Sequence, residues 1–238
     1  MRAAPGPTFP PLLRGEEAPH GIDPMLRAVS VAALGTDPGL IVWQAGADRL
    51  AAAVVLAPEQ PLEQAMGAVF AVALGLGDAV GALAPPEVAV HYDWPGGFRV
   101  NGARCGRMRA QASTTDPAAE PDWLVIGIEI PFLPPPEHAE APGLVPDETS
   151  LANEGCLEIT PVQLLESWSR HMLVWLNRLE SEGFAGLHAA WRERGWRIGE
   201  TLEDGGTFMG LDEFGGQLVR RGDTTELRPL SVMLEGGA

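Results

Sequence analysis

The segment from His91 to Gly106 constrains the fold of this chain more than any other. Its first extended run is broken at Trp94-Pro95, two glycines follow, and Asn101-Gly102 lies a few residues later. Proline has no amide hydrogen to donate to a sheet, and Asn-Gly between extended runs is the strongest short hairpin signal. We therefore expect a strand that ends at Trp-Pro, followed by a hairpin of 98–100 with 104–112 in an antiparallel setting.

Helix and strand signals alternate along the chain without regular βαβ units. Asp23-Pro24 and Thr160-Pro161 each combine a capping side chain with proline at the first helical position. The helices expected from these and similar signals are 24–35, 61–83, 160–181 and 184–194, and the strands are 40–43, 51–57, 88–94 and 123–132 besides the hairpin. This order predicts the α+β class, with a mixed or antiparallel sheet flanked by helices.

Changes of composition suggest three segments. Residues 1–20 are rich in proline and predict an irregular arm, 21–195 form the main domain, and 196–238 contain short apolar pieces separated by glycines. The last segment predicts a small β domain that packs on the main one, because so few residues bury little surface alone. Residues 133–150 predict a loop. The apolar stretch 62–83 contains two acidic residues and four glycines, which favours a buried core helix over a membrane span.

Charge excludes several kinds of partner. The 238 residues have a formal charge of −16, and all 16 basic residues are arginine because the chain has no lysine. Binding to nucleic acid or to an anionic membrane requires a basic surface, so we expect neither partner. Cys105 and Cys156 could form a disulfide, but two free thiols in a reducing compartment are the expectation, and cytoplasmic is the expected location.

The order of elements around the Trp-Pro hairpin resembles that of the biotin–protein ligase and lipoate–protein ligase superfamily. In biotin ligases the corresponding segment is typically Lys-Trp-Pro-Asn-Asp, then a strand, a turn and Lys-Leu-Ala-Gly. Here 93–97 match the first part and Arg104-Cys105-Gly106 the second. Further similar stretches are 44–46 at the start of the ligand loop, 124–127, 182–192, and 206–218 for the SH3-like C-terminal domain.

The resemblance implies a fold and a chemistry. The fold would be a class II synthetase-like mixed sheet flanked by helices, with a small SH3-like β domain after it. The chemistry would be attack of a carboxylate on the α-phosphate of ATP, with Mg²⁺, and transfer of the acyl group to a lysine of a carrier protein. Such a site needs cationic donors for the oxygens and an apolar slot for the acid.

Three departures from the family pattern bear on that chemistry. The Gly/Arg-rich loop, which folds over the adenylate in the family, is reduced to 46–49. The Asn-Asp pair after Trp-Pro is replaced by Gly96-Gly97, which removes two polar side chains. The lysine of Lys-Leu-Ala-Gly corresponds to Arg104, which keeps the positive charge and adds a bidentate donor fork.

The strongest candidate for a catalytic role is Arg104, because of that correspondence. Arg107 would bind the ligand, with Arg109 just beyond, unless these are solvated arginines on an edge strand. Simple alternation along a strand would place Arg107 and Arg109 on one face and Arg104 on the other. His91 and Asp93 would share a face, either as a pair that lines the ligand pocket or as a satisfied polar pair at a sheet edge.

The other candidate ligand contacts have structural alternatives. Trp94 would form a ligand wall or pack in the core, and the resemblance places Gly96 and Gly97 in the ligand site, where the family handles phosphate and metal. Asp48 and Arg49 would contact the ligand or form a turn with a local ion pair. No metal site is expected, since no other histidine or cysteine lies at a metal-binding spacing from His91.

Two functions follow from the resemblance and the departures. The first is ATP-dependent attachment of a biotin- or lipoate-type acyl group to a carrier-protein lysine. The second is a non-catalytic ligase-like protein that binds a small carboxylate or a carrier-protein partner. The shortened loop and Gly96-Gly97 argue against the family's known adenylation chemistry and so favour the binding protein. A preserved cleft would favour a ligase that acts on a different substrate.

Overall fold

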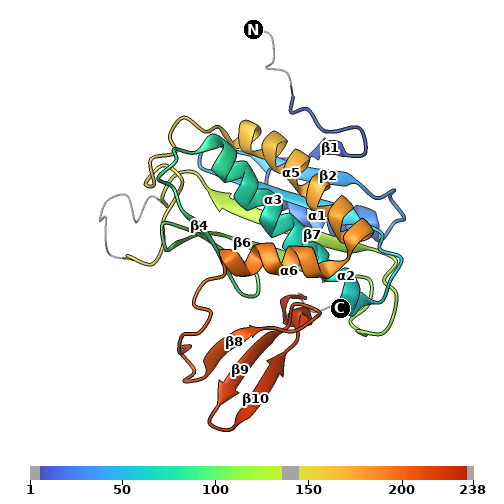
Figure 1. Ribbon diagram of the computed structural model, residues 1–238. Helices are drawn as coiled ribbons and strands as arrows, with labels where there is room; N and C mark the ends of the chain where they lie inside the picture. Colours follow the sequence, from blue (N-terminus) through green and yellow to red (C-terminus); the bar gives the residue numbers. More distant parts are fainter. Residues whose placement is uncertain (1–5, 136–144, 235–238) are drawn as a thin grey trace.

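The computed structural model describes residues 6–135 and 145–234 as a layered main body and a small sheet below it (Figure 1). The main body contains a seven-stranded sheet in the order β1-β2-β3-β7-β6-β5-β4. Only β1 and β2 are parallel, and every other pair is antiparallel. The predicted α+β class with a mixed sheet is confirmed. The central part of the predicted 133–150 loop, 136–144, lies outside the described residues.

The strands of the large sheet coincide largely with the apolar runs of the sequence. Both sides of the predicted Asn-Gly hairpin form, and β3 and β7 pair along their whole length at the centre. The strands are β1 (Arg14–Glu17), β2 (Leu40–Ala45), β3 (Arg49–Leu56), β4 (Val90–Asp93), β5 (Gly97–Val100), β6 (Ala103–Ala112) and β7 (Leu124–Pro131).

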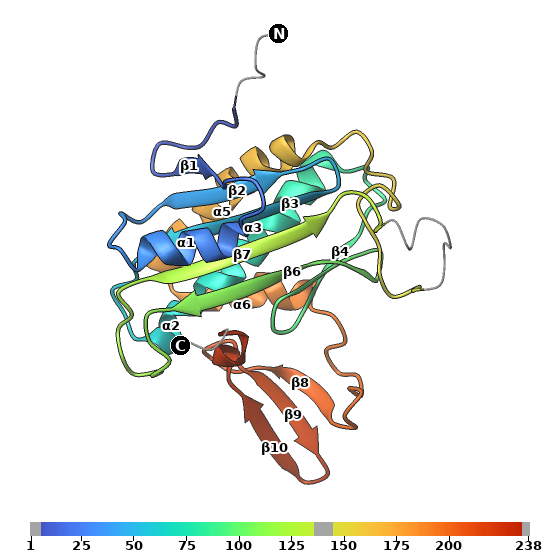
Figure 2. The same cartoon turned by 180° about the vertical axis from the view of Figure 1, so that it is seen from behind.

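Helices cover both faces of this sheet. Helix α1 (Pro24–Ala32) lies alone on one face, as the view from behind shows (Figure 2). Helices α3 (Ala68–Leu83), α5 (Pro161–Glu182) and α6 (Phe184–Glu193) lie on the other. The predicted caps form: Asp23 accepts a hydrogen bond from the Met25 amide, and Thr160 forms a reciprocal capping box with Gln163.

Part of the N-terminal arm is more ordered than its prolines suggest. Arg14–Glu17 form β1, which pairs in parallel with β2, where the sequence predicted irregular chain. The neighbouring side chains of Leu13 and Ala18 are buried. No alternation or β-branched run marks this strand in the sequence, so its formation depends on the exposed edge of β2 that it covers.

The apolar stretch predicted as one helix is interrupted. A short α2 (Leu62–Ala65) precedes α3, and the intervening amides of Gly67, Val69 and Phe70 bond to the carbonyl three residues back instead of four. A Cβ on Gly67 would lie 3.2 Å from Phe184, so α6 approaches the chain closely there. The stretch is long and apolar enough to span a membrane by composition, yet 78% of its most apolar window is buried inside the protein, as a core helix requires.

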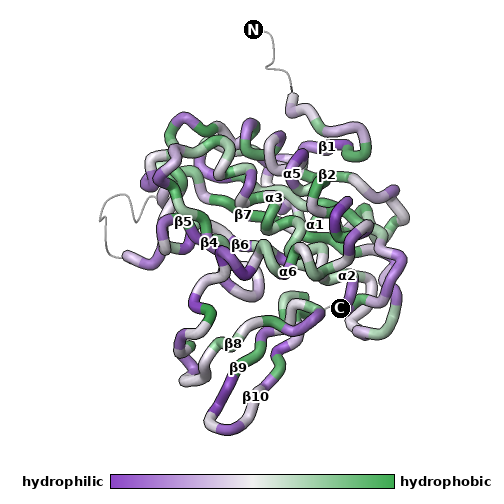
Figure 3. The backbone as a smooth tube through the Cα atoms, in the orientation of Figure 1, coloured by the Kyte–Doolittle hydropathy of each residue, from purple (hydrophilic) through white to green (hydrophobic). Residues whose placement is uncertain are grey.

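The hydrophobic residues gather between the sheet and the helices (Figure 3). The larger cluster lies between the sheet and α3, α5 and α6, and its biggest fully buried side chains include Trp168, Tyr92 and Phe70. A smaller cluster under α1 contains Met25 and Leu40, and its other buried members are alanines and valines such as Val42. The cluster to which a buried strand residue belongs shows which face of the sheet its side chain lies on. The neighbouring polar side chains, including those of the candidate site, lie on the opposite face.

The last segment forms a three-stranded antiparallel sheet in the order β10-β9-β8, followed by the short helix η1 (Leu230–Met233). Its strands are β8 (Thr207–Leu211), β9 (Gln217–Arg221) and β10 (Thr224–Arg228). The Trp94 indole donates a hydrogen bond of 3.0 Å to the Gly215 carbonyl, and thereby connects the Trp-Pro hairpin to this small sheet.

Candidate functional site

A β-bulge at Gly106 determines which way the arginines of β6 point. Gly97 pairs with Arg107 and Arg99 with Arg104, so β6 contains one more residue than β5 between these two pairs. The extra residue shifts the alternation by one position. Arg104 therefore lies on the same face as Arg107, and the expectation that simple alternation would separate them is wrong.

Gly106 is suited to this bulge for two reasons. Its φ of +136° is a backbone conformation that other residues rarely adopt, and a Cβ there would lie 2.5 Å from the Glu129 carbonyl oxygen. Cys105 and Met108 on either side are buried toward the α3 and α5 layer. The arginines consequently face the α1 side of the sheet, beyond the end of α1.

We call this surface the arginine face and define it by Arg49, Arg104, Arg107 and Arg109. The Glu129 carboxylate joins two of these residues: it accepts hydrogen bonds from Arg107 Nε and Nη2 at 3.0 and 2.8 Å, and lies 3.3 Å from Arg49 Nη1. The structure thus brings the predicted Arg49 and Arg107 together from β3 and β6, across β7.

Arg109 forms the other close ion pair of this face. Its Nη2 donates to both carboxylate oxygens of Asp23, at 2.8 and 2.7 Å, while Asp23 also caps α1. A cavity of about 200 Å³ lies here, lined by Gly21, Ile22, Asp23, Pro24, Arg49, Ala51, Arg109 and Glu129. Two cations and two anions thus surround a small hollow at the N-terminus of α1.

Arg104 is held more loosely than its neighbours. Its side chain is 52% exposed, and Nη2 lies 3.6 Å from Asp147 and 3.7 Å from Glu148. Two backbone hydrogen bonds with the segment 147–149 fix the main chain of Arg104. Its amide donates to the Asp147 carbonyl, and its carbonyl accepts from the Thr149 amide. The backbone is therefore fixed, and the guanidinium can turn toward an oxyanion at small cost.

His91 and Asp93 share the predicted face but do not act as a pair. Asp93 forms an ion pair of 2.9 Å with Arg99 Nε, and the Arg99 side chain is only 6% exposed. Arg99 also lies over the Trp196 ring, at 4.9 Å. The His91 ring contacts the same indole, and burial together with the Arg99 charge lowers the pKa of His91. His91 therefore lies beside an arginine that Asp93 holds, in surroundings that favour its uncharged form.

Trp94, Gly96 and Gly97 are engaged inside the protein. Trp94 reaches the C-terminal sheet, as described above. A Cβ on Gly96 would lie 2.5 Å from Met233 Cε, because η1 packs against this turn. A Cβ on Gly97 would lie 2.7 Å from Asp93 Cβ. These two glycines allow close packing within the fold.

The β2–β3 turn contains residues 46–48, which the resemblance matches to the family's ligand loop. The Gly46 amide donates to the Arg49 carbonyl, and the Asp48 carbonyl accepts from the amides of Phe132 and Leu133 at 2.7 and 3.0 Å. Asp48 therefore ties the turn to the end of β7. A turn so short and so bonded has no residues to fold over a ligand.

Cys105 and Cys156 are both buried and free. Burial raises the pKa of both thiols, with further contributions from Glu154. A thiol whose pKa is raised is a poor nucleophile. Residues 6–135 and 145–234 contain no group of three or more histidine, cysteine, aspartate or glutamate side chains arranged to hold a metal ion.

Sequence reasoning missed two contributors to the arginine face. Glu129 is the sole charged residue of β7, and an acid inside an otherwise apolar strand was the signal that could have identified it. Asp23 was recognised only as a helix cap, because its second partner lies 86 residues away. Arg99 was also missed, although it is 5% exposed and holds Asp93.

Comparisons with known proteins identify relatives of this fold. The family model described as "Biotin/lipoate A/B protein ligase family" matches residues 9–193. A biotin protein ligase-like protein of unknown function from Silicibacter sp. TM1040 is 48% identical, with a TM-score of 0.90 over 97% of this chain and 100% of that one. The biotin protein ligase of Aquifex aeolicus is 17% identical, with a TM-score of 0.71 over 95% and 97% of the two chains, which shows a shared fold.

One curated relative is a biotin–[acetyl-CoA-carboxylase] ligase from Paracoccus denitrificans. It is 27% identical over 202 residues, which are 82% of this chain and 83% of that protein. The family match covers most of the main body and includes the whole Trp-Pro hairpin and the arginine face. The chain therefore belongs to the biotin/lipoate A/B protein ligase family.

Proposed function

We propose that this protein binds a small carboxylate on the arginine face and does not activate it as an adenylate. The observation that carries the proposal is the bulge at Gly106, which turns Arg104, Arg107 and Arg109 to one side of β6. Arginine forks match the two oxygens of a carboxylate. Arg104 and Arg107 have side chains 52% and 64% exposed, so both can reach a ligand from solvent.

The acidic partners of these arginines compete with a ligand carboxylate for the guanidinium groups. A ligand carboxylate must compete with Glu129 for Arg107, whereas Arg104 makes only contacts of 3.6 and 3.7 Å with its two acids. Exposed ion pairs contribute little stability, so exchanging one partner for a ligand costs little. Arg104 is therefore the residue we assign to first capture of the carboxylate, and Arg107 to its second contact.

The proposal against adenylation is supported by the β2–β3 turn. With Asp48 bonded to Phe132 and Leu133, residues 46–48 have no length to cover an acyl-adenylate and exclude water. Gly96 packs against Met233, where the family resemblance places a polar side chain. A carboxylate bound here would stay exposed to solvent, which suits a binding or carrier-recognition role.

The chemical class of the ligand comes from relatives. Structures of the Aquifex aeolicus ligase contain biotin, or biotin and ATP. We carry over to this protein only the acid and not the nucleotide. The proposed partner is a biotin- or lipoate-type carboxylate, either free or presented by a carrier protein. The proposal includes a cytoplasmic location, which the free, buried Cys105 and Cys156 support.

ATP-dependent ligation is the second candidate, and a specific observation favours it. The Paracoccus denitrificans ligase matches the chain over 82% of its length at 27% identity. Under this alternative Arg104 would hold the acyl-adenylate in place of the family's lysine. Release of pyrophosphate from ATP in the presence of an acid distinguishes the two candidates directly.

The test is calorimetric titration of the whole protein with biotin, lipoate and octanoate, each with and without ATP and Mg²⁺. We expect one acid to bind without nucleotide and no pyrophosphate to be released. Arg104→Gln should weaken that affinity by about 10-fold or more, since a charge-assisted hydrogen bond contributes roughly 1.5–3 kcal/mol.

Arg220→Gln is the matched control, because Arg220 is exposed on β9 of the separate small sheet. If Arg104→Gln, Arg220→Gln and the unchanged protein bound the acid with equal affinity, the assignment of the ligand to the arginine face would be wrong. Acid-dependent pyrophosphate release would establish the ligase alternative instead.

A further inference from the structure

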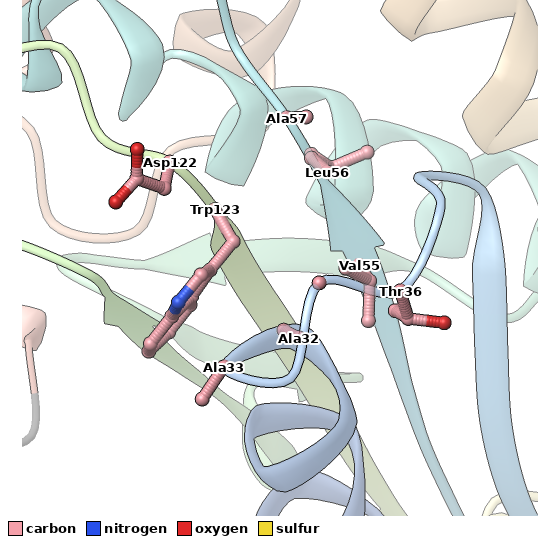
Figure 4. A pocket seen from close by; sticks show the side chains of 9 residues that line it. Ala32, Ala33, Thr36, Val55, Leu56, Ala57, Asp122 and Trp123 are labelled. Atoms are coloured by element: carbon pink, nitrogen blue, oxygen red, sulfur yellow. The ribbon is translucent and has the colours of Figure 1, made fainter.

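A second hollow lies at the opposite end of α1 from the arginine face. Its volume is about 310 Å³, and residues from three segments line it: Ala32, Ala33, Gly35, Thr36, Val55, Leu56, Ala57, Asp122 and Trp123. Figure 4 shows the Trp123 side chain beside Ala33, with Val55 and Thr36 across from it and Asp122 at the rim. None of these residues belongs to the arginine face, so the hollow is a separate feature of the fold.

The floor and one wall of this hollow are apolar. Val55 is 1% exposed and Ala32 4%, and both belong to the cluster under α1. Trp123 packs against that cluster and is partly exposed. An indole is the best aromatic partner for a cation held over its face. The apolar floor accommodates methyl or methylene groups, and the indole adds an attraction for positive charge.

The electrostatic features of the rim also favour a cation. The hollow lies where α1 ends, and the C-terminus of a helix has partial negative charge. The Asp122 carboxylate is exposed at the same rim, and within residues 6–135 and 145–234 no arginine or histidine forms an ion pair with it. The described lining residues include one acid and no base.

One arginine lies nearby and must be weighed. Arg14 Nη2 donates to Thr36 Oγ1 at 3.2 Å and to the Asp37 carbonyl at 2.8 Å, and Nη1 donates to the Pro38 carbonyl. These three bonds hold Arg14 on the Thr36 side. A bound cation would consequently lie toward Trp123 and Asp122, away from Arg14.

The two residues of the cation side are already held in place. The Asp122 amide donates to Ser113 Oγ at 2.7 Å, and the Ser113 amide donates to the Trp123 carbonyl at 3.1 Å. The backbone at 122–123 is thus fixed to the end of β6 before any ligand arrives. A preformed site loses less conformational entropy on binding.

We propose that this hollow binds a small organic cation, an alkylammonium or quaternary ammonium group, between Trp123 and Asp122. A volume of about 310 Å³ is at the lower end of small-molecule sites, which suits a compact cationic head with few further atoms. The site is separate from the carboxylate site, and the two can be tested independently.

The test uses nitrogen-labelled whole protein titrated with choline while the tryptophan indole resonances are followed by NMR. Trp123→Phe identifies the Trp123 resonance. We expect choline to shift this resonance saturably, with a dissociation constant in the millimolar range, and dimethylbutanol, the uncharged isostere with carbon in place of nitrogen, to bind at least about fivefold more weakly.

Asp122→Asn should weaken choline binding by about five- to tenfold. Glu120→Gln removes the same charge from the same loop but lies outside the lining, and should leave the affinity unchanged. Equal binding of choline and its neutral isostere, or equal losses in Asp122→Asn and Glu120→Gln, would overturn the proposal. So would the absence of any shift of the Trp123 resonance.

Discussion

Gly75, in the middle of α3, supports a prediction in which two effects of opposite sign compete. In an isolated helix, Gly→Ala stabilises by about 1 kcal/mol, because alanine loses less conformational entropy. Here a Cβ on Gly75 would lie 2.6 Å from both the Cα and the N of Met172 on α5. Non-bonded carbon atoms prefer about 3.5–4.0 Å, so the backbones of α3 and α5 would have to move apart by roughly 1 Å.

The steric effect outweighs the helix propensity because the obstacle is backbone. A side chain could rotate away, whereas Met172 Cα moves only with its helix, inside the larger hydrophobic cluster. Overpacking a core costs about 1–3 kcal/mol and sometimes more, and an unyielding obstacle places this case at the upper end. After subtraction of the propensity gain, we expect Gly75→Ala to lower the free energy of unfolding by about 2 kcal/mol.

Gly81 provides a matched control in the same helix. A Cβ there meets nothing within 4 Å, so Gly81→Ala should stabilise by about 0.5–1 kcal/mol. Urea titration followed by circular dichroism measures both changes, and thermal unfolding of Gly75→Ala should occur about 4–8 °C lower. If Gly75→Ala stabilised the protein as much as Gly81→Ala does, the close approach of α3 and α5 would be refuted.

Two further predictions concern the Trp-Pro hairpin. Burial raises the pKa of Tyr92, the sole tyrosine, to about 12. The tyrosine of the unfolded chain, with a pKa near 10, therefore loses its proton at lower pH than the folded one. The free energy of unfolding should consequently fall by up to about 2–3 kcal/mol as the pH rises from 10 toward 12. Urea midpoints measure this loss, Tyr92→Phe should abolish most of it, and an equally steep fall in that variant would contradict the assignment. Trp94→Phe loses the hydrogen bond to Gly215 and should increase amide hydrogen exchange in the small sheet, reflecting about 1 kcal/mol, whereas unchanged exchange there would show that other contacts hold it.

Local signals in the sequence were sufficient for most of the elements. Asp23-Pro24 and Thr160-Pro161 start helices because their caps satisfy amides a few residues away, and Asn101-Gly102 turns because both residues adopt positive φ. The family resemblance followed from the same local patterns in order. Interactions of this kind involve residues only a few positions apart, so a single sequence is enough to identify them.

Long-range contacts decided the candidate site. The bulge at Gly106 changes the direction of Arg104, and it depends on how β6 aligns with β5 and β7. The close pairs of Arg107 with Glu129 and of Arg109 with Asp23 join residues 22 and 86 positions apart. Strand β1 likewise forms only because β2 offers an open edge.

The sequence by itself determined the fold class, the helix starts, the Trp-Pro hairpin and the set of arginines available to bind an anion. The tertiary structure alone decided which of these arginines share a face, which acids neutralise them, and that the β2–β3 turn is closed by β7. The reason is physical: propensity and capping act over a few residues, whereas strand register and charge pairing depend on which distant segments pack together.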